Sequence, residues 1–409
     1  MKYSGVEWLG KIPHDWEVLK AKRIFKLKNE KNSELKPLLS VSKGRGLLLR
    51  EEMVNRPTHA QKNIEAFKLV GDGDFVIHLR SFQSGFELSS IEGAVSPAYT
   101  VFNARKNDEV CNKYYKYIFY SKPFIDKIAS TTLSLRDGKP ISYDDFSITL
   151  LPVPNYIEQQ KIAAFLDEKV SHIDNIIEDT KKSIENLKTY KQSLITETIT
   201  KGLDPNVEMK DSGIDWIGDI PKHWNPIKLK YLVELRNEKK NYKKGDRYIG
   251  LENIESYNGR INSVQIDYNS GLTDFFKKGD VLFNKLRPYL AKGFIAEFDA
   301  FGSGELLVLT QYKGDKRFLL YYLLSSKFID VINSSTYGAK MPRANWDFIK
   351  ELSISSTSKE EQGKIADFLD EKSRTIDSTI EQKKQLVIEL ESYKKSLIYE
   401  YVTGKKEVK

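Results

Sequence analysis

The chain has 409 residues, of which 40% are hydrophobic and 30% charged, and this composition predicts a folded globular protein with two to four domains. Its formal net charge is +8, with 65 Lys and Arg against 57 Asp and Glu, which suits a polyanionic partner without requiring one. A single cysteine, Cys111, excludes internal disulfides and a zinc site of four cysteines. No run of about 18 apolar residues predicts a membrane span, so we expect a soluble, cytoplasmic protein.

The first 156 residues predict a globular segment of short elements. Strands are predicted at 75–80, 98–102 and 147–151, and a short helix at 114–120. From 157 to 200 the chain has neither Gly nor Pro, and Gly202 follows as a helix stop. Apolar residues recur there three and four positions apart, as in the seam of a coiled coil, and the seam residues are Leu166, Ile173, Ile177, Ile184, Leu187 and Leu194.

The second half of the chain repeats this order. Strands are predicted at 247–251, 281–284 and 306–309, before a second long helix from 359 to 402. The seam of this helix is predicted to be Leu369, Ile376, Ile380, Leu390 and Leu397. Two motifs also recur: the segment 8–16, Trp-Leu-Gly-Lys-Ile-Pro-His-Asp-Trp, returns at 216–224, and the segment 159–169 returns at 362–372. The chain is therefore a duplication, with a period too long for a solenoid repeat.

The duplication predicts an α+β protein with a pseudo-two-fold internal repeat, in which two globular α/β domains are separated by two long antiparallel coiled-coil helices. The predicted segments are a first domain at 1–156, a helix at 157–204, a second domain at 205–357 and a helix at 358–409. The helices are identical at about half of their positions at an offset of 203, whereas the globular parts share only their Gly and Pro punctuation. Similar helices indicate a shared role, such as packing on each other and on identical partners, and dissimilar domains indicate two different targets. A purely structural helical hairpin is the alternative.

No pattern of catalytic residues stands out. The sequence lacks a Gly-x-x-x-x-Gly-Lys-Ser/Thr phosphate loop and a Gly-x-Gly-x-x-Gly fingerprint, and its five histidines show no paired spacing for a metal. The acidic pairs Asp167-Glu168 and Asp370-Glu371 are interpreted as ion-pair partners of lysines four residues away on the same helix. We therefore predict no catalytic residue, no metal site and no cofactor on this chain.

Basic and aromatic residues gather instead in loops between predicted strands, at matching places in both halves. Arg, Lys, Gln and Asn can present donors to base edges and phosphates, and Gly lets a backbone approach closely. The residues that we predict to contact DNA are Lys43, Arg45, Arg80, Gln83, Arg136 and Lys139 in the first domain, and Asn284, Lys285, Arg287, Tyr289, Lys292, Lys340 and Arg343 in the second. For any single one of them, an ordinary solvated loop residue is the alternative.

Taken together, the motifs resemble those of the specificity subunits of type I restriction–modification systems over nearly the whole chain. Each half opens with Trp-x-Gly-x-Ile-Pro-x-x-Trp, and each long helix opens with Glu-Gln-x-Lys-Ile-Ala-x-Phe-Leu-Asp-Glu-Lys. Further motifs of the resemblance are 96–101, 248–254, 279–290 and 303–308. In the first half the segment 39–45, Leu-Ser-Val-Ser-Lys-Gly-Arg, stands in place of the 248–254 motif.

The resemblance implies two target recognition domains that each bind one half of an interrupted double-stranded DNA site, and two spacer helices that dock two modification subunits. It also implies that S-adenosylmethionine belongs to those subunits, that ATP and Mg²⁺ serve the restriction subunits, and that this chain has no catalytic activity of its own. Methylation inside a duplex requires base flipping, so the domains should hold DNA beside an extruded adenine. The rival interpretations are a coiled-coil scaffold without DNA readout and a self-contained DNA nuclease or methyltransferase.

Overall fold

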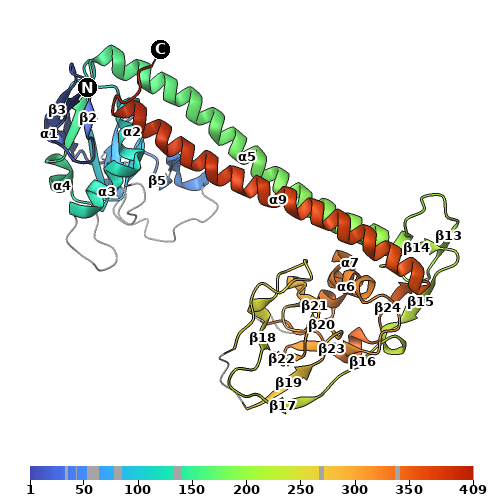
Figure 1. Ribbon diagram of the computed structural model, residues 1–409. Helices are drawn as coiled ribbons and strands as arrows, with labels where there is room; N and C mark the ends of the chain where they lie inside the picture. The colour runs from blue at the N-terminus through green and yellow to red at the C-terminus, as the bar shows by residue number, and fades with distance from the viewer. Residues whose placement is uncertain are drawn as a thin grey trace. The chain divides into compact units, whose positions relative to one another are not determined.

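The computed structural model describes residues 1–32, 36–42, 44–52, 64–77, 85–131, 141–266, 271–336 and 341–408. The chain divides into two compact units, Met1–Thr180 with Gln385–Lys409, and Lys181–Lys384. Each unit joins one globular α+β domain to parts of two long helices, α5 (Tyr156–Lys201) and α9 (Lys359–Val402) (Figure 1). The predicted α+β class and the two predicted long helices are confirmed.

The first domain is built on a four-stranded antiparallel sheet. Its order is β4-β11-β8-β9, with the strands Phe25–Lys28, Thr100–Ala104, Phe75–Ile77 and Phe86–Leu88. Two-stranded pairs surround it: β1 (Lys2–Tyr3) with β2 (Lys11–Ile12), β3 (Glu17–Lys20) with β12 (Leu150–Val153), β5 (Leu39–Ser42) with β6 (Gly46–Leu49), and β7 (Lys68–Val70) with β10 (Gly93–Val95). The helical elements are α1 (Ala21–Ile24), α2 (Asn112–Tyr120), α3 (Lys122–Thr131) and α4 (Tyr143–Ser147), with short 3₁₀ turns η1 (Arg50–Glu52) and η2 (Ile64–Ala66).

Aromatic side chains form the core of this domain. The ring of Phe25 meets Phe75 and Phe102 of the sheet edge-to-face, with centroids 5.7 and 5.3 Å apart, and Tyr115 of α2 at 5.1 Å. The same buried cluster extends to the first turns of α5, where Leu166 is fully buried. The start of α5 is thus part of the domain core.

The second domain repeats this plan with different residues. Its main sheet, β16-β23-β20-β21, has the same strand order and comprises Glu234–Leu235, Leu306–Thr310, Val281–Asn284 and Gly293–Ile295. A further sheet, β17-β19-β22-β18, comprises Lys239–Asn241, Leu272–Phe276, Ala300–Gly302 and Tyr248–Ile249, and its β18–β22 pair is parallel. The remaining elements are β13 (Met209–Asp211) with β14 (Asp219–Pro221), β15 (Asn225–Lys228) with β24 (Ser353–Ser356), the helices α6 (Lys316–Leu324), α7 (Ser326–Ser334) and α8 (Trp346–Ile349), and the 3₁₀ turns η3 (Leu229–Tyr231), η4 (Leu251–Asn253) and η5 (Pro288–Leu290).

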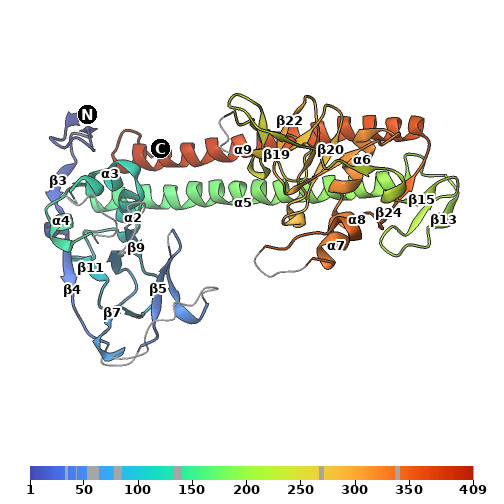
Figure 2. The same ribbon diagram turned by 90° about the horizontal axis from the view of Figure 1, so that it is seen from below.

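Within each unit α5 and α9 run antiparallel and lie side by side (Figure 2). In the first unit, Phe165 stacks near Tyr401 with ring centroids 4.4 Å apart, and Asp174 accepts a hydrogen bond from Lys394, so residues further along α5 meet residues earlier in α9. No helix in the described part of the chain is both long and apolar enough to cross a membrane.

The seam residues lie in buried clusters. In the first unit the cluster holds Leu166, Ile173, Ile177 and Leu397, with Leu390 packed against it. In the second unit Leu369 lies in the domain core, and a separate cluster to which only the two helices contribute holds Ile184, Leu187, Leu194, Ile376 and Ile380.

Three strands differ from their predicted positions. The strand predicted at 98–102 is β11, which is shifted to Thr100–Ala104. The strand predicted at 147–151 is β12, shifted to Leu150–Val153, because Ser142 accepts a hydrogen bond from the backbone of Asp145 and caps helix α4 just before it. Pro152 lies inside this strand, where a two-stranded pair tolerates its missing N–H. The strand predicted at 247–251 shortens to β18, since η4 begins at Leu251.

Candidate nucleic-acid interface

The repeated motifs form the joint between each globular domain and the long helix that follows it. In the first unit the indole Nε1 of Trp16 donates to Glu158 at 2.9 Å, and in the second unit Trp224 donates to Glu361 at 3.1 Å. Both tryptophans are fully buried. The repeated Trp and the repeated Glu of the helix opening are therefore the two halves of one contact.

The two aspartates of the helix motif, Asp167 and Asp370, bind the globular domain, whereas Glu168 pairs with Lys169 of its own helix. Tyr117 of α2 donates to Asp167 at 2.7 Å, and Tyr321 of α6 donates to Asp370 at 2.7 Å. Arg317 donates to Asp370 as well, at 2.8 Å. Burial, reinforced by the neighbouring carboxylate, raises the pKa of both tyrosines well above the usual value, so their hydroxyls stay donors at neutral pH. The interpretation of Asp167 and Asp370 as same-helix partners was wrong.

Each domain also holds the far end of the other long helix within its unit. The buried hydroxyl of Tyr114 donates to the carbonyl of Val402 at 2.8 Å in the first unit. In the second unit Ser355 donates to the carbonyl of Ile199 at 3.0 Å. Val402 and Ile199 are equivalent at the offset of 203, so each domain is attached to the start of one helix and to the end of the other, although the donor is a helix tyrosine in one unit and a strand serine in the other.

The 285–292 loop of the second domain has a strained, defined backbone. Arg287 (φ 50°) and Ala291 (φ 44°) flank the turn η5 in the left-handed region, which residues with a side chain rarely adopt. Tyr257, itself at φ 59°, buttresses the turn: its N–H donates to the carbonyl of Ala291 at 2.8 Å, and its hydroxyl donates to the carbonyl of Tyr289 at 3.0 Å. Strain of this kind concentrates at functional sites, where the surroundings enforce it.

Asn284 organises this loop from beneath. Its amide nitrogen donates to the carbonyls of Leu286 at 2.8 Å and Arg287 at 3.0 Å, and its amide oxygen accepts from the N–H of Lys292 at 2.8 Å. The residue is fully buried. In this conformation Asn284 has no exposed surface with which to touch DNA, and it sets the shape of the loop instead.

A distant segment is bound to the same loop. The N–H of Arg287 donates to Pro342 at 2.7 Å, and that of Ala344 donates to Lys285 at 2.8 Å. The exposed Arg343 between them forms an ion pair with Glu305 at 2.5 Å. The structure therefore brings four residues predicted from the sequence to one surface: Lys285, Arg287, Tyr289 and Arg343.

Lys292 and Lys340 complete the predicted set of the second domain. The ammonium of Lys292 donates to the carbonyl of Leu251 at 2.7 Å, which ties the 248–254 motif to the 285–292 loop. Lys340 lies outside the described residues.

In the first domain the β5–β6 turn, residues 42–46, is held by a buried carboxylate. Glu87 of β9 accepts the N–H groups of Gly44 at 2.8 Å and Gly46 at 3.2 Å, and it also accepts from the hydroxyl of Tyr120. Burial raises the pKa of Glu87, although these hydrogen bonds and nearby Lys116 oppose that shift. The predicted Arg45 is exposed on this turn. The other predicted residues of this domain lie outside the described residues: Lys43, Arg80, Gln83, Arg136 and Lys139.

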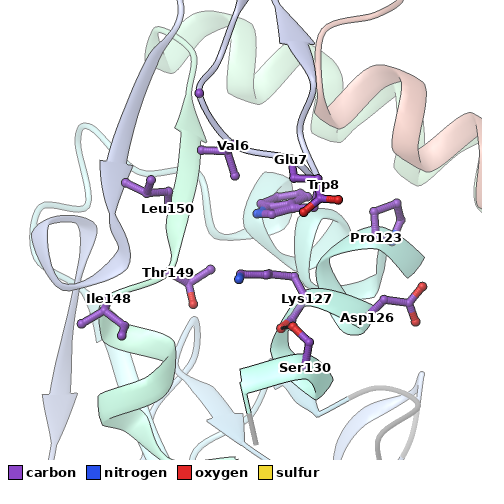
Figure 3. A pocket seen from close by; sticks show the side chains of 11 residues that line it. Val6, Glu7, Trp8, Pro123, Asp126, Lys127, Ser130, Ile148, Thr149 and Leu150 are labelled. Atoms are coloured by element: carbon purple, nitrogen blue, oxygen red, sulfur yellow. Dashed lines mark hydrogen bonds between the residues drawn. The ribbon is translucent and has the colours of Figure 1, made fainter.

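A cavity of about 710 Å³ opens elsewhere in the first domain (Figure 3). Its wall is largely apolar, with Val6, Trp8, Pro123 and Leu150, and the side chain of Lys127 points into it. Of the predicted DNA contacts that the structure describes, none lines this cavity. Glu7 and Asp126 also line the cavity, and their carboxylates disfavour a phosphate, so we do not place the nucleic-acid interface here. Among the described residues there is also no group of three side chains that could hold a metal ion.

Comparison with known proteins agrees with this geometry. Residues 221–390 match the sequence model of the family described as type I restriction modification DNA specificity domain. The chain is 24% identical to the type I restriction enzyme MjaVIII specificity subunit of Methanocaldococcus jannaschii, a match that covers 98% of this chain and 95% of that protein. It is 22% identical to the EcoDI specificity subunit of Escherichia coli over 54% of this chain and 53% of that protein.

Solved structures share the fold. One, from a study of complex assembly and conformational transition of the type I restriction–modification system, aligns with a TM-score of 0.74 at 13% identity and covers 97% of this chain and all of that one. The HsdS subunit from Thermoanaerobacter tengcongensis aligns with a TM-score of 0.56 at 14% identity over 99% of this chain and all of that one.

Residues 221–390 therefore carry a domain of the DNA-specificity class. Over nearly its whole length the chain is similar to curated specificity subunits of type I restriction enzymes, and its fold is that of the solved structures named above.

Proposed function

We propose that this chain recognises a bipartite double-stranded DNA site, with one half-site read by each globular domain, and that it docks the modification and restriction subunits of a type I complex. The observation that carries this proposal is a contrast between joints and loops. The joints at Trp16 and Trp224 are the same contact in both units. The loops that we propose to contact DNA differ between the domains. The first domain has a glycine-rich turn with Arg45, and the second has the 285–292 loop. Two domains that share the same joint to the helices but carry different loops fit a DNA target whose two half-sites differ in sequence.

The described loops offer distinct chemistries to DNA. Arg45 and Arg287 can donate to guanine O6 and N7 in the major groove, or to phosphates. Tyr289, with 44% of its surface exposed, can stack on or donate to the DNA, while Lys285 and Arg343 suit phosphate contacts. Asn284 and Lys292 act by holding the loop, through the hydrogen bonds of their side chains to backbone groups.

Equivalent exposed residues on the long helices suit a pair of identical partners. Tyr190 of α5 and Tyr393 of α9 are equivalent at the offset of 203 and are 57% and 56% exposed. Exposed tyrosine is a common anchor at protein interfaces. We assign these two residues to the docking of two modification subunits, one on each helix.

Cofactors belong to the partners in this proposal. The modification subunits bind S-adenosylmethionine and methylate an adenine, and the restriction subunits use ATP and Mg²⁺. We also propose that the complex acts on DNA in the cytoplasm. A coiled-coil scaffold without DNA readout is the alternative, and it predicts DNA binding that is indifferent to sequence.

The test is to reconstitute the full chain with its modification subunits and to map methylated adenine in a random DNA library. A two-part motif with a fixed gap is expected. Arg45→Ala should relax base preference in one half and Arg287→Ala in the other, because a lost bidentate arginine costs about 1–3 kcal/mol of discrimination. One uninterrupted motif, or methylation by this chain alone, would refute the proposal. For docking, Tyr190→Ala with Tyr393→Ala should reduce the number of modification subunits bound per chain, whereas equal stoichiometry would exclude these anchors.

A further inference from the structure

A short loop of the second domain, residues 255–261, contacts both the 285–292 loop and the long helices. Tyr257 in this loop supports the turn at Tyr289 and Ala291 through the two hydrogen bonds described above. The next residue, Asn258, accepts a hydrogen bond from the ammonium of Lys191 on α5 at 3.0 Å. The loop is therefore held by the DNA-facing turn on one side and by a helix on the other.

Lys191 is itself fixed by the second helix. Its ammonium donates to Asp377 of α9 at 2.8 Å, and the two side chains are only 9% and 21% exposed. Arg260, at the end of the same loop, lies 3.6 Å from the other carboxylate oxygen of Asp377. A contact network thus runs from both helices through Asn258 and Tyr257 to the turn, and all of its members belong to the second unit.

Packing alone does not fix this loop. A cavity of about 450 Å³ opens beside it, and Lys191, Tyr257, Asn258 and Asp377 are among the residues that line it. Where apolar packing is incomplete, directed hydrogen bonds and charges decide the position of a segment. The strained φ of Tyr257 also needs partners on both sides to persist.

The duplication supplies an internal comparison. Lys394 and Asp174 occupy the positions equivalent to Lys191 and Asp377, and they form the same ion pair in the first unit. Their side chains are 28% and 49% exposed. In the described part of the first domain, no residue accepts a hydrogen bond from Lys394 as Asn258 does from Lys191. The two helices form this ion pair in both units. Among the described residues, only the second unit has a domain loop that is hydrogen-bonded to the lysine of the pair.

From this we infer that Lys191, held by Asp377, is a positioning residue for the second half-site: through Asn258 and Tyr257 it sets the place of the 285–292 turn on DNA. This rests on the proposed function, in which that turn reads DNA. Lys191 touches no base in this assignment. It acts by fixing the support of residues that do.

The test compares variants of the full chain, each reconstituted with the modification subunits, on a library in which every base of both half-sites is varied. Lys191→Met and Asn258→Ala should each reduce discrimination in the second half-site by about tenfold, within the range of coupling carried by contact networks. Discrimination in the first half-site should stay unchanged. Lys394→Met is the matched control and should change neither half-site. Arg287→Ala, measured in parallel, reports whether the turn reads DNA at all.

Lys191→Met leaves Asp377 with only the longer contact to Arg260, so the double variant Lys191→Met/Asp377→Leu is included to remove both charges of the helix pair together. It should show the same selective loss at the second half-site, and the midpoint of thermal unfolding separates this loss from unfolding. Unchanged discrimination in all three of these variants, while Arg287→Ala relaxes the second half-site, overturns the inference alone. An Arg287→Ala chain with full discrimination overturns the proposed role of the turn. Equal losses in both half-sites would show that Lys191 serves only the fold.

Discussion

Lys191 and Asp377 meet at 2.8 Å in the second unit, and their equivalents Lys394 and Asp174 meet at 2.5 Å in the first. The duplication has therefore kept a specific helix–helix ion pair twice. The two copies differ in burial, since Lys191 is 9% exposed and Lys394 is 28% exposed at the side chain. The same Lys–Asp ion pair therefore occurs in a more buried and in a more exposed environment within one chain, and each copy serves as a control for the other.

The difference in burial predicts a difference in stability. Asp377→Asn leaves the largely buried ammonium of Lys191 without a counter-charge and should cost about 3 kcal/mol of unfolding free energy. Asp174→Asn breaks a more exposed pair and should cost less than about 1 kcal/mol. Urea unfolding of the two variants, followed by the same probe, measures both. Equal costs would mean that exposure does not govern these pairs.

The joints at the helix starts should respond to pH with opposite signs. Burial raises the pKa of Glu158, opposed by the hydrogen bond from Trp16 and assisted by nearby Asp15. Burial acts the same way on Glu361, but hydrogen bonds from Thr357, His223 and Trp224 outweigh it and leave its pKa lowered. Glu361 therefore contributes stability above about pH 5 that is lost as the pH falls through its lowered pKa, whereas the contribution of Glu158 is present at low pH and is lost as the pH rises through its raised pKa.

Two isosteric variants test this sign. Relative to the parent chain, Glu361→Gln should become less stable as the pH rises from 4 toward 6, and Glu158→Gln should become more stable over about the same range. The midpoint of thermal unfolding, measured at several pH values, gives both slopes. Slopes of the same sign would contradict the opposite pKa directions of Glu158 and Glu361.

The carboxylate beneath the β5–β6 turn predicts a local effect. Glu87→Gln replaces one acceptor oxygen by an NH₂ group that cannot accept the N–H of Gly44 or Gly46, so one turn amide loses its partner at a cost of about 1–3 kcal/mol. Hydrogen exchange of one of these two amides should accelerate. Base discrimination in the first half-site alone should fall. Tyr120→Phe removes a donor to Glu87 without touching the turn amides, and it should leave their exchange slow.

The long helices and several strands could be predicted because their signals are local. An unbroken apolar period and a stop at Gly202 predict α5, and the continuous apolar runs at 281–283 and 306–309 match most of β20 and most of β23. The partners of Asp167 were misjudged because only its own helix was considered. Its partners, Tyr117 and Lys113, come from helix α2 of the globular domain.

The candidate interface could be predicted only in part, because its geometry depends on contacts between segments that are distant in the sequence. Composition predicts which loops are basic, but the burial of a loop residue depends on segments far away in the sequence. Asn284 looks like a base reader in sequence and is buried in the fold. Glu87, Tyr257 and Asn258 carry no sequence signal, because each acts through contacts that arise only when distant segments meet.

Asn284 and Tyr289 provide the sharpest contrast within that interface. Asn284→Asp keeps the size of the side chain but turns the donor to the carbonyls of Leu286 and Arg287 into an acceptor. Two carbonyls then face a carboxyl group in a buried site, and the unfolding free energy should fall by about 2–3 kcal/mol. Tyr289→Ala, at an exposed position, should change stability by less than about 0.5 kcal/mol. Both variants should weaken reading of the second half-site, the first by collapsing the loop and the second by removing its contact. Thermal unfolding separates these causes: a stable Asn284→Asp chain with an intact loop would show that the amide does not hold the turn, and a destabilised Tyr289→Ala chain would show that Tyr289 supports the fold.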